Sequence, residues 1–115
     1  MKKYMLTFFG GSMALRYDNL HNADKEAQEK HRAAWSEWIS ELMKAGQLEM
    51  GYPLEAEGKR VDADGVQAYH FPDTTEGGFI VVKAESPEQA AEISEGAPII
   101  KNGGYILVRP CGAVK

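Results

Sequence analysis

The sequence predicts an α+β fold of the ferredoxin-like, βαββαβ type, in which an antiparallel sheet carries two helices on one face. The strongest observation is the order of strand-like and helix-like segments, which follows β-α-β-(β)-β-α-β. The length of 115 residues is close to the commonest size of a single domain, so we expect residues 1–115 to form one domain. Apolar residues make up 43% and charged residues 26% of the chain, an ordinary globular composition.

The first strand and the first helix follow from the pattern of residues 4–46. Residues 4–9 are aromatic and apolar and end at two glycines, which is typical of a buried strand. Asn22 or Asp24 can cap the following helix, and Gly46 is a suitable residue just beyond its end. The apolar stripe of this helix, spaced at three to four residues, comprises Ala27, His31, Ala34, Trp35, Trp38, Leu42 and Ala45.

The middle of the chain predicts an edge strand, a hairpin and a loop. Residues 47–54 alternate in polarity, and Pro53 favours the edge of the sheet because proline cannot donate a backbone hydrogen bond. Residues 60–62 are expected to pair with residues 67–71 as a hairpin. Residues 72–78 contain Pro, Asp and paired Gly, which predicts a loop.

The last third of the chain predicts a strand, a helix and a final strand. Residues 79–84 form the clearest strand pattern. Ser86, Pro87 and Gln89 together resemble a helix start, with a capping serine, a proline in the first turn and a glutamine three residues after the cap. We expect this helix to end at Gly96 and a last strand to run over residues 105–109.

The alternation along the last two strands predicts a homodimer. One face of the sheet is expected under the helices, and it carries Ile80, Val82, Ile106 and Val108. The opposite face then carries Phe79, Val81, Tyr105 and Leu107. Because a monomer would leave this second apolar face in water, we expect two copies to pack sheet to sheet about a two-fold axis.

Composition argues against several other partners and locations. The net charge is −4 and the basic residues are scattered, so no nucleic-acid partner is expected. The amino-terminal apolar run is too short for a signal or a membrane span, and a lone Cys111 fits a reducing compartment, so we expect a cytoplasmic protein. His21, His31 and His70 do not share a metal-binding spacing, so neither a metal nor another cofactor is expected.

The chain resembles the YCII-related family, and within it the branch called DGPF-domain proteins. The segments that carry the resemblance are residues 3–6 (KYML), 35–38 (WSEW), 51–54 (GYPL), 77–79 (GGF), 84–90 (AESPEQA) and 108–110 (VRP). The resemblance implies a dimeric α+β barrel and a family without one settled reaction. The DGPF tetrapeptide itself is absent, and residues 69–73 (YHFPD) take its place. Alignment on Gly46 puts Trp35 where the shorter branch has a histidine proposed as an acid or base, and His31 lies one turn earlier.

Three aromatic or titratable residues of the long helix are candidates for a site. His31 lies in the middle of the apolar stripe, where an imidazole can exchange protons near neutral pH. The alternative is a core histidine that is hydrogen-bonded to a backbone carbonyl. Trp35 and Trp38 are candidates for the walls of a ligand pocket, although tryptophans at helical spacing are more often part of the core.

Four further residues are candidates elsewhere in the chain. His70 and Asp73 are three residues apart, so the carboxylate could orient the imidazole as in an acid–base pair, or both could belong to a solvated turn. Arg109 and Tyr52 are candidate anion-binding residues, and Arg109 could equally pair with an acid across a dimer interface.

Two functional hypotheses follow. The first is a small cofactor-free enzyme that performs acid–base chemistry on a carbonyl-bearing or aromatic small molecule. The second is a non-catalytic dimeric module that binds a small ligand, or a partner protein, and serves as an accessory or sensing unit. Substitution of the histidines separates the two, because only the enzyme needs a proton carrier.

Overall fold

The main sheet confirms the predicted ferredoxin-like topology. The computed structural model describes residues 1–10, 25–72, 74–101 and 103–113. Strands β1 (Lys2–Gly10), β2 (Leu48–Pro53), β5 (Gly78–Ala84) and β6 (Gly104–Pro110) lie in the order β2-β5-β1-β6. All neighbouring strands are antiparallel. Strand β2, which ends at Pro53, is an edge strand as predicted.

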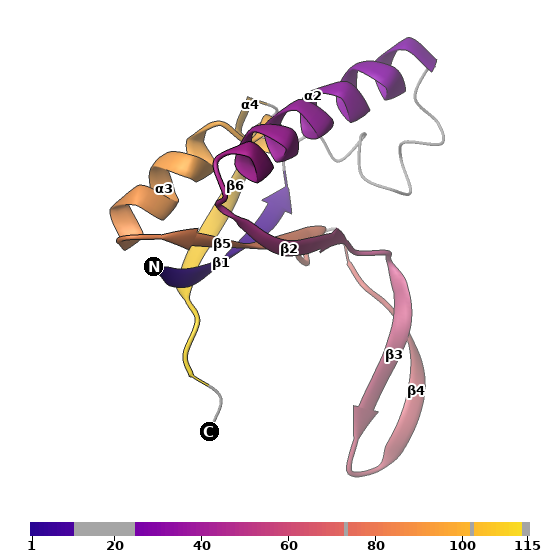
Figure 1. Ribbon diagram of the computed structural model, residues 1–115. Helices are drawn as coiled ribbons and strands as arrows, with labels where there is room; N and C mark the ends of the chain where they lie inside the picture. The colour runs from indigo at the N-terminus through magenta and orange to yellow at the C-terminus, as the bar shows by residue number, and fades with distance from the viewer. Residues whose placement is uncertain (11–24, 73, 102, 114–115) are drawn as a thin grey trace.

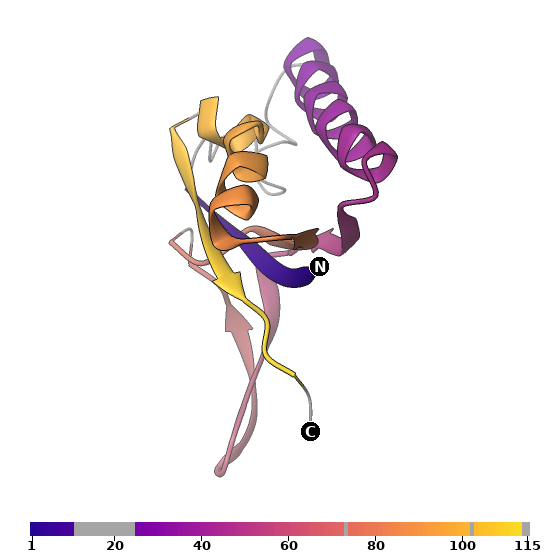
Figure 2. The same ribbon diagram turned by 60° about the vertical axis from the view of Figure 1, so that its left-hand side comes forward.

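In the described part of the chain, three helices cover one face of this sheet (Figures 1 and 2). They are α2 (Lys25–Lys44), α3 (Pro87–Glu95) and the short α4 (Pro98–Lys101). The predicted start of α3 is confirmed, because the Ser86 hydroxyl accepts a hydrogen bond from the backbone N–H of Gln89 at 3.1 Å. The proposed caps of α2, Asn22 and Asp24, lie outside the described residues. Helix α4 was not predicted, since a four-residue helix has no periodicity to read.

The core lies between the helices and the inner face of the sheet. It contains Tyr4, Leu6 and Phe8 of β1, Ile80 and Val82 of β5, and Trp38 and Leu42 of α2. The predicted stripe of α2 was wrong at Ala34 and at Ala45, because both are exposed and Ala45 lies beyond the end of the helix. The stripe also omitted Ile39, which packs against the core. Trp35, Trp38, Ile39 and Leu42 follow the i, i+3, i+4, i+7 pattern of one helix face, and Ala34 lies beside that face.

The other face of the sheet, which we call the outer face, is apolar, and no helix of the described residues lies on it (Figures 1 and 2). Its side chains include Met5, Thr7, Phe9, Met50, Tyr52, Phe79, Val81, Tyr105, Leu107 and Arg109. Tyr105 and Leu107 are each 52% exposed, whereas Ile80 and Val82 on the inner face are buried. The predicted alternation between the two faces is therefore confirmed.

A separate two-stranded sheet forms a projecting hairpin. Strands β3 (Glu57–Asp62) and β4 (Gly65–His70) pair with Arg60 opposite Gln67, which confirms the predicted hairpin and extends it to Glu57. Figures 1 and 2 show the hairpin leaving the main sheet on the side away from the helices. Every residue of β4 is exposed.

Candidate functional site

An aromatic cluster joins the long helix to the centre of the sheet. The ring of Phe8, buried in β1, meets the rings of Trp35 and Trp38 edge to face, with centroids 5.2 Å and 6.1 Å away. The two indoles lie 5.7 Å apart. Trp38 is buried, and its indole N–H donates to the backbone carbonyl of Ile93 in α3 at 3.3 Å. Trp38 is therefore a satisfied core residue, while the half-buried Trp35 is the more accessible of the two.

His31 extends this cluster by one helical turn. Its ring lies 6.1 Å from the ring of Trp35 in an edge-on arrangement, and the side chain is half-buried. Burial, and secondarily the positive charge of the adjacent Arg32, lower the pKa of the His31 imidazole below its ordinary value. Because the neutral form then dominates at neutral pH, His31 is suited to accept a proton.

His70 has an acidic neighbour that the sequence did not reveal. Across the hairpin, His70 pairs with Glu57, and its Nδ1 contacts the Glu57 carboxylate. Both side chains are well exposed. A carboxylate at Nδ1 fixes the orientation of the imidazole, which is the function that the sequence analysis assigned to Asp73. Asp73 lies outside the described residues.

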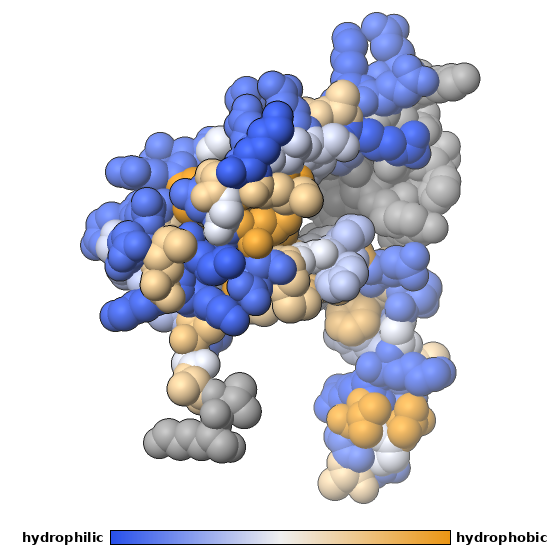
Figure 3. All heavy atoms as spheres, viewed as in Figure 1, coloured by the Kyte–Doolittle hydropathy of each residue, from blue (hydrophilic) through white to orange (hydrophobic). Residues whose placement is uncertain are grey.

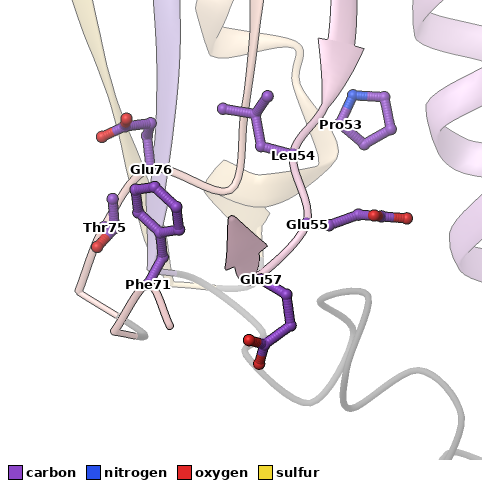
Figure 4. A pocket seen from close by; sticks show the side chains of 7 residues that line it. All are labelled: Pro53, Leu54, Glu55, Glu57, Phe71, Thr75 and Glu76. Carbon is purple, nitrogen blue, oxygen red and sulfur yellow. The ribbon is translucent and has the colours of Figure 1, made fainter. Parts of the chain in front are cut away.

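A pocket of about 540 Å³ opens at the base of the hairpin (Figure 4). Its lining residues are Pro53, Leu54, Glu55, Glu57, Phe71, Thr75 and Glu76. Two backbone hydrogen bonds hold together the segments that line it. Leu54 N–H donates to Gly77 O at 3.0 Å, and Phe71 N–H donates to Ala56 O at 2.6 Å. Sequence reasoning missed this pocket because it lies between two segments that only the pairing of β2 with β5 brings together.

The candidate residues therefore fall into three places. His31, Trp35 and Trp38 lie together on α2. His70 lies on the hairpin, next to a residue that lines the pocket. Tyr52 and Arg109 lie on the outer face of the sheet, where the Tyr52 ring is 6.3 Å from the ring of Phe79. The sheet separates these last two residues from the aromatic cluster, so a single copy does not bring all seven candidates into one site.

The described residues lack both a cluster of metal ligands and a membrane-spanning helix. Within the described ranges, no three His, Cys, Asp or Glu side chains are grouped in a way that could hold a metal ion. In the same part of the chain, no helix has the length and apolar character needed to cross a membrane.

Comparisons with known proteins extend the resemblance seen in the sequence. A family model described as the YCII-related domain matches residues 12–110. No curated protein matches the chain. A similar solved structure is 5-chloro-2-hydroxyhydroquinone dehydrochlorinase (TftG) from Burkholderia phenoliruptrix AC1100, in complex with 2,5-dihydroxybenzoquinone. The two chains are 17% identical with a TM-score of 0.58, and the match covers 96% of this chain and 93% of that chain. This likeness shows a shared fold.

Proposed function

The chain belongs to the YCII-related domain family, and from this premise we propose that it is a cofactor-free enzyme that exchanges protons with a carbonyl-bearing or aromatic small molecule. The observation that carries the proposal is His31, a half-buried histidine with a lowered pKa at the end of an aromatic cluster. A neutral imidazole beside an apolar wall accepts a proton without first losing one to water.

The substrate class follows from the surroundings of His31. Trp35 offers a partly accessible indole on which a flat, conjugated ring can stack. His31 lies beside this indole, so a ring that stacks there is within its surroundings without a charged group to hold it. The similar dehydrochlorinase binds 2,5-dihydroxybenzoquinone, which is a ring compound with carbonyl groups. That ligand belongs to the class proposed here, and it is the natural first probe.

The test is solvent deuterium exchange into 2,5-dihydroxybenzoquinone, followed by proton NMR. Each ring C–H carbon belongs to an enol–carbonyl unit, so exchange begins when this carbon accepts a deuteron from the solvent and becomes tetrahedral. A base then removes the original proton, which restores the enol and leaves deuterium on the ring. We expect the protein to accelerate this exchange, and the His31→Asn variant to lose about 10²- to 10⁴-fold of the acceleration, the usual contribution of a positioned base. His70→Asn is the matched control and should retain the full rate.

Binding is measured separately from chemistry. Trp35 and Trp38 are the two tryptophans of the chain, so tryptophan fluorescence reports directly on the cluster. Calorimetry provides a second measure of affinity, because quinones absorb light. Exchange that is equally fast with His31→Asn, or the absence of both binding and exchange, would contradict the proposal.

A non-catalytic binding module is the second candidate, and the pocket at the base of the hairpin favours it. None of the residues that line this pocket is His31, Trp35 or Trp38. A ligand held there needs no proton carrier, and the protein would then act as an accessory or sensing unit. Binding that survives His31→Asn but is lost in Phe71→Ala, without any exchange, would favour this second function.

We also propose that the functional unit is a homodimer built on the outer face. The exposed fractions of Tyr52, Tyr105 and Leu107 are large for apolar side chains on a continuous sheet face. Packing two outer faces together would bury them and would place Tyr52 and Arg109 at the interface. Leu107→Lys should abolish the dimer in sedimentation experiments. Met43→Lys, at an exposed apolar position of α2, should not.

A further inference from the structure

The projecting hairpin has one face that is apolar toward its tip. Because side chains alternate along a strand, Glu57, Lys59 and Val61 share a face with their cross-strand partners His70, Ala68 and Val66. We call this set of six residues the valine face. This face is polar at the base of the hairpin, where Glu57 contacts His70, and apolar near the turn, where Val61 pairs with Val66. The opposite face carries Tyr69 at its base, next to the ring of Phe71, and the polar residues Arg60, Asp62 and Gln67 toward the turn.

The valine face is exposed in a single copy of the chain. Val61 is 72% exposed and Val66 is 63% exposed. Figure 3 shows apolar side chains at the surface near the free end of the hairpin. A strand pair that packs on one side places its apolar side chains on that side, as Val61 and Val66 are placed near the turn, so this valine pair indicates a missing partner.

The shape of the chain supports the same view. The radius of gyration is 15.5 Å, whereas a compact chain of 115 residues has about 13 Å. An isolated two-stranded hairpin is marginally stable in water, because it buries little apolar surface. A hairpin that extends into solvent with an apolar face is therefore expected to gain stability from a second molecule.

We propose that the occupant of the valine face is a second copy of this chain. In the homodimer, the hairpin is then an arm that packs against the partner. This inference rests on the homodimer proposed above and adds a contact outside its central sheet interface. The hairpin leaves the sheet on the side away from the helices, which is the side of the outer face (Figures 1 and 2). A partner seated on the outer face therefore lies beside the hairpin.

The hairpin adds to the area that the outer face offers to a partner. Four strands spaced about 4.8 Å apart and about 23 Å long cover a plane of roughly 450 Å². A stable interface of standard size buries about 800 Å² of accessible surface on each partner, and the planar area is a lower limit on the accessible surface that the outer face supplies. One face of the hairpin, six residues long on each strand, adds about 200 Å².

The test compares two adjacent residues that lie on opposite faces of the same strand. Val66→Glu places a charge on the valine face, and Gln67→Glu places the same charge on the polar face, opposite Arg60. Both positions are exposed in the single chain, so neither variant disturbs its core. In sedimentation-velocity experiments over a concentration series, we expect Val66→Glu to raise the dimer dissociation constant at least tenfold. Gln67→Glu should stay within twofold of the wild type.

A milder variant separates lost contact from a lost hairpin. Val66→Thr keeps the β-branched shape that favours a strand, and it should still raise the dissociation constant by a few-fold. A dimer with unchanged affinity in Val66→Glu and Val66→Thr would overturn the arm while leaving the sheet interface in place. The wild-type chain is also measured at a concentration on the order of 10⁻⁴ M. A chain that stays monomeric there would overturn both the arm and the homodimer.

Discussion

At the scale of single residues, His31 connects the proposed chemistry with the pH dependence of stability. Its pKa in the folded chain is lowered by burial and by Arg32, whereas the unfolded chain has the ordinary value of about 6.5. Between these two values the unfolded chain binds more protons than the folded chain, so the free energy of unfolding rises with pH. Stability from this group is complete above about pH 6.5, and it is lost as the pH falls through the folded pKa.

We therefore predict that His31→Gln flattens the pH dependence of stability. The urea midpoint of the wild type should fall more between pH 7.5 and pH 5 than that of the variant. An NMR titration of the imidazole should give a pKa below about 6.5 in the wild type, and Arg32→Gln should move it upward because a neighbouring positive charge is removed. A wild-type pKa above 6.5 would show that burial does not dominate at this position.

The candidate residues show what sequence can predict at this scale. His31, Trp35 and Trp38 share a helix, so the 3.6-residue period is enough to place them together. Glu57 and His70 are thirteen residues apart, and only the register of the hairpin makes them neighbours. Tyr52 and Arg109 are candidate anion-binding residues, and strand alternation, which the sequence already contains, places them across the sheet from His31.

At the scale of elements, the start of α3 has a predictable energetic contribution. The Ser86 side chain satisfies the backbone N–H of Gln89, which would otherwise have no helical partner. Ser86→Ala should lower the free energy of unfolding by about 1 kcal/mol. Ser36→Ala, an exposed position inside α2, should leave it unchanged or raise it slightly because alanine favours helices. Urea unfolding of the two variants measures the difference, and equal effects would contradict the cap.

The contact between β2 and β5 depends on a glycine. A Cβ atom at Gly51 would lie 2.7 Å from the backbone oxygen of Phe79 and would also overlap the side chain of Ile80. Gly51→Ala should therefore destabilise the fold by about 1–3 kcal/mol, as overpacking does elsewhere. Gly112→Ala is the matched control, since a Cβ there meets nothing within 4 Å. Thermal melts of both variants give the comparison, and equal melting temperatures would mean that β2 can shift freely.

The sequence predicts the position of some elements better than that of others. The Ser86-Pro87 start of α3 and the positive-φ Gly46 after α2 are local signals, because each depends on a few adjacent residues. The pairing within the hairpin is also local, since Arg60 and Gln67 are close in sequence. Its direction relative to the main sheet is not local, because it depends on the chain path at Leu54–Ala56 and Phe71–Pro72, where no repeating pattern exists.

At the scale of the whole molecule, a homodimer couples folding to protein concentration. If folded chains pair and unfolded chains do not, mass action stabilises the native state as concentration rises. For a dimer of this size, a tenfold increase in concentration should raise the melting temperature by about 3 °C, given the usual enthalpy per residue. Leu107→Lys should remove this dependence because it places a charge on the outer face, on the edge strand β6.

The hairpin variants extend the same experiment. Val66→Glu keeps the outer face intact, so its melting temperature should still rise with concentration, but the curve should be displaced toward higher concentration by the factor that separates the dissociation constants. Gln67→Glu should follow the wild-type curve. A melting temperature that is independent of concentration in the wild type would mean that each chain folds without a partner, and the apolar outer face would then require another explanation.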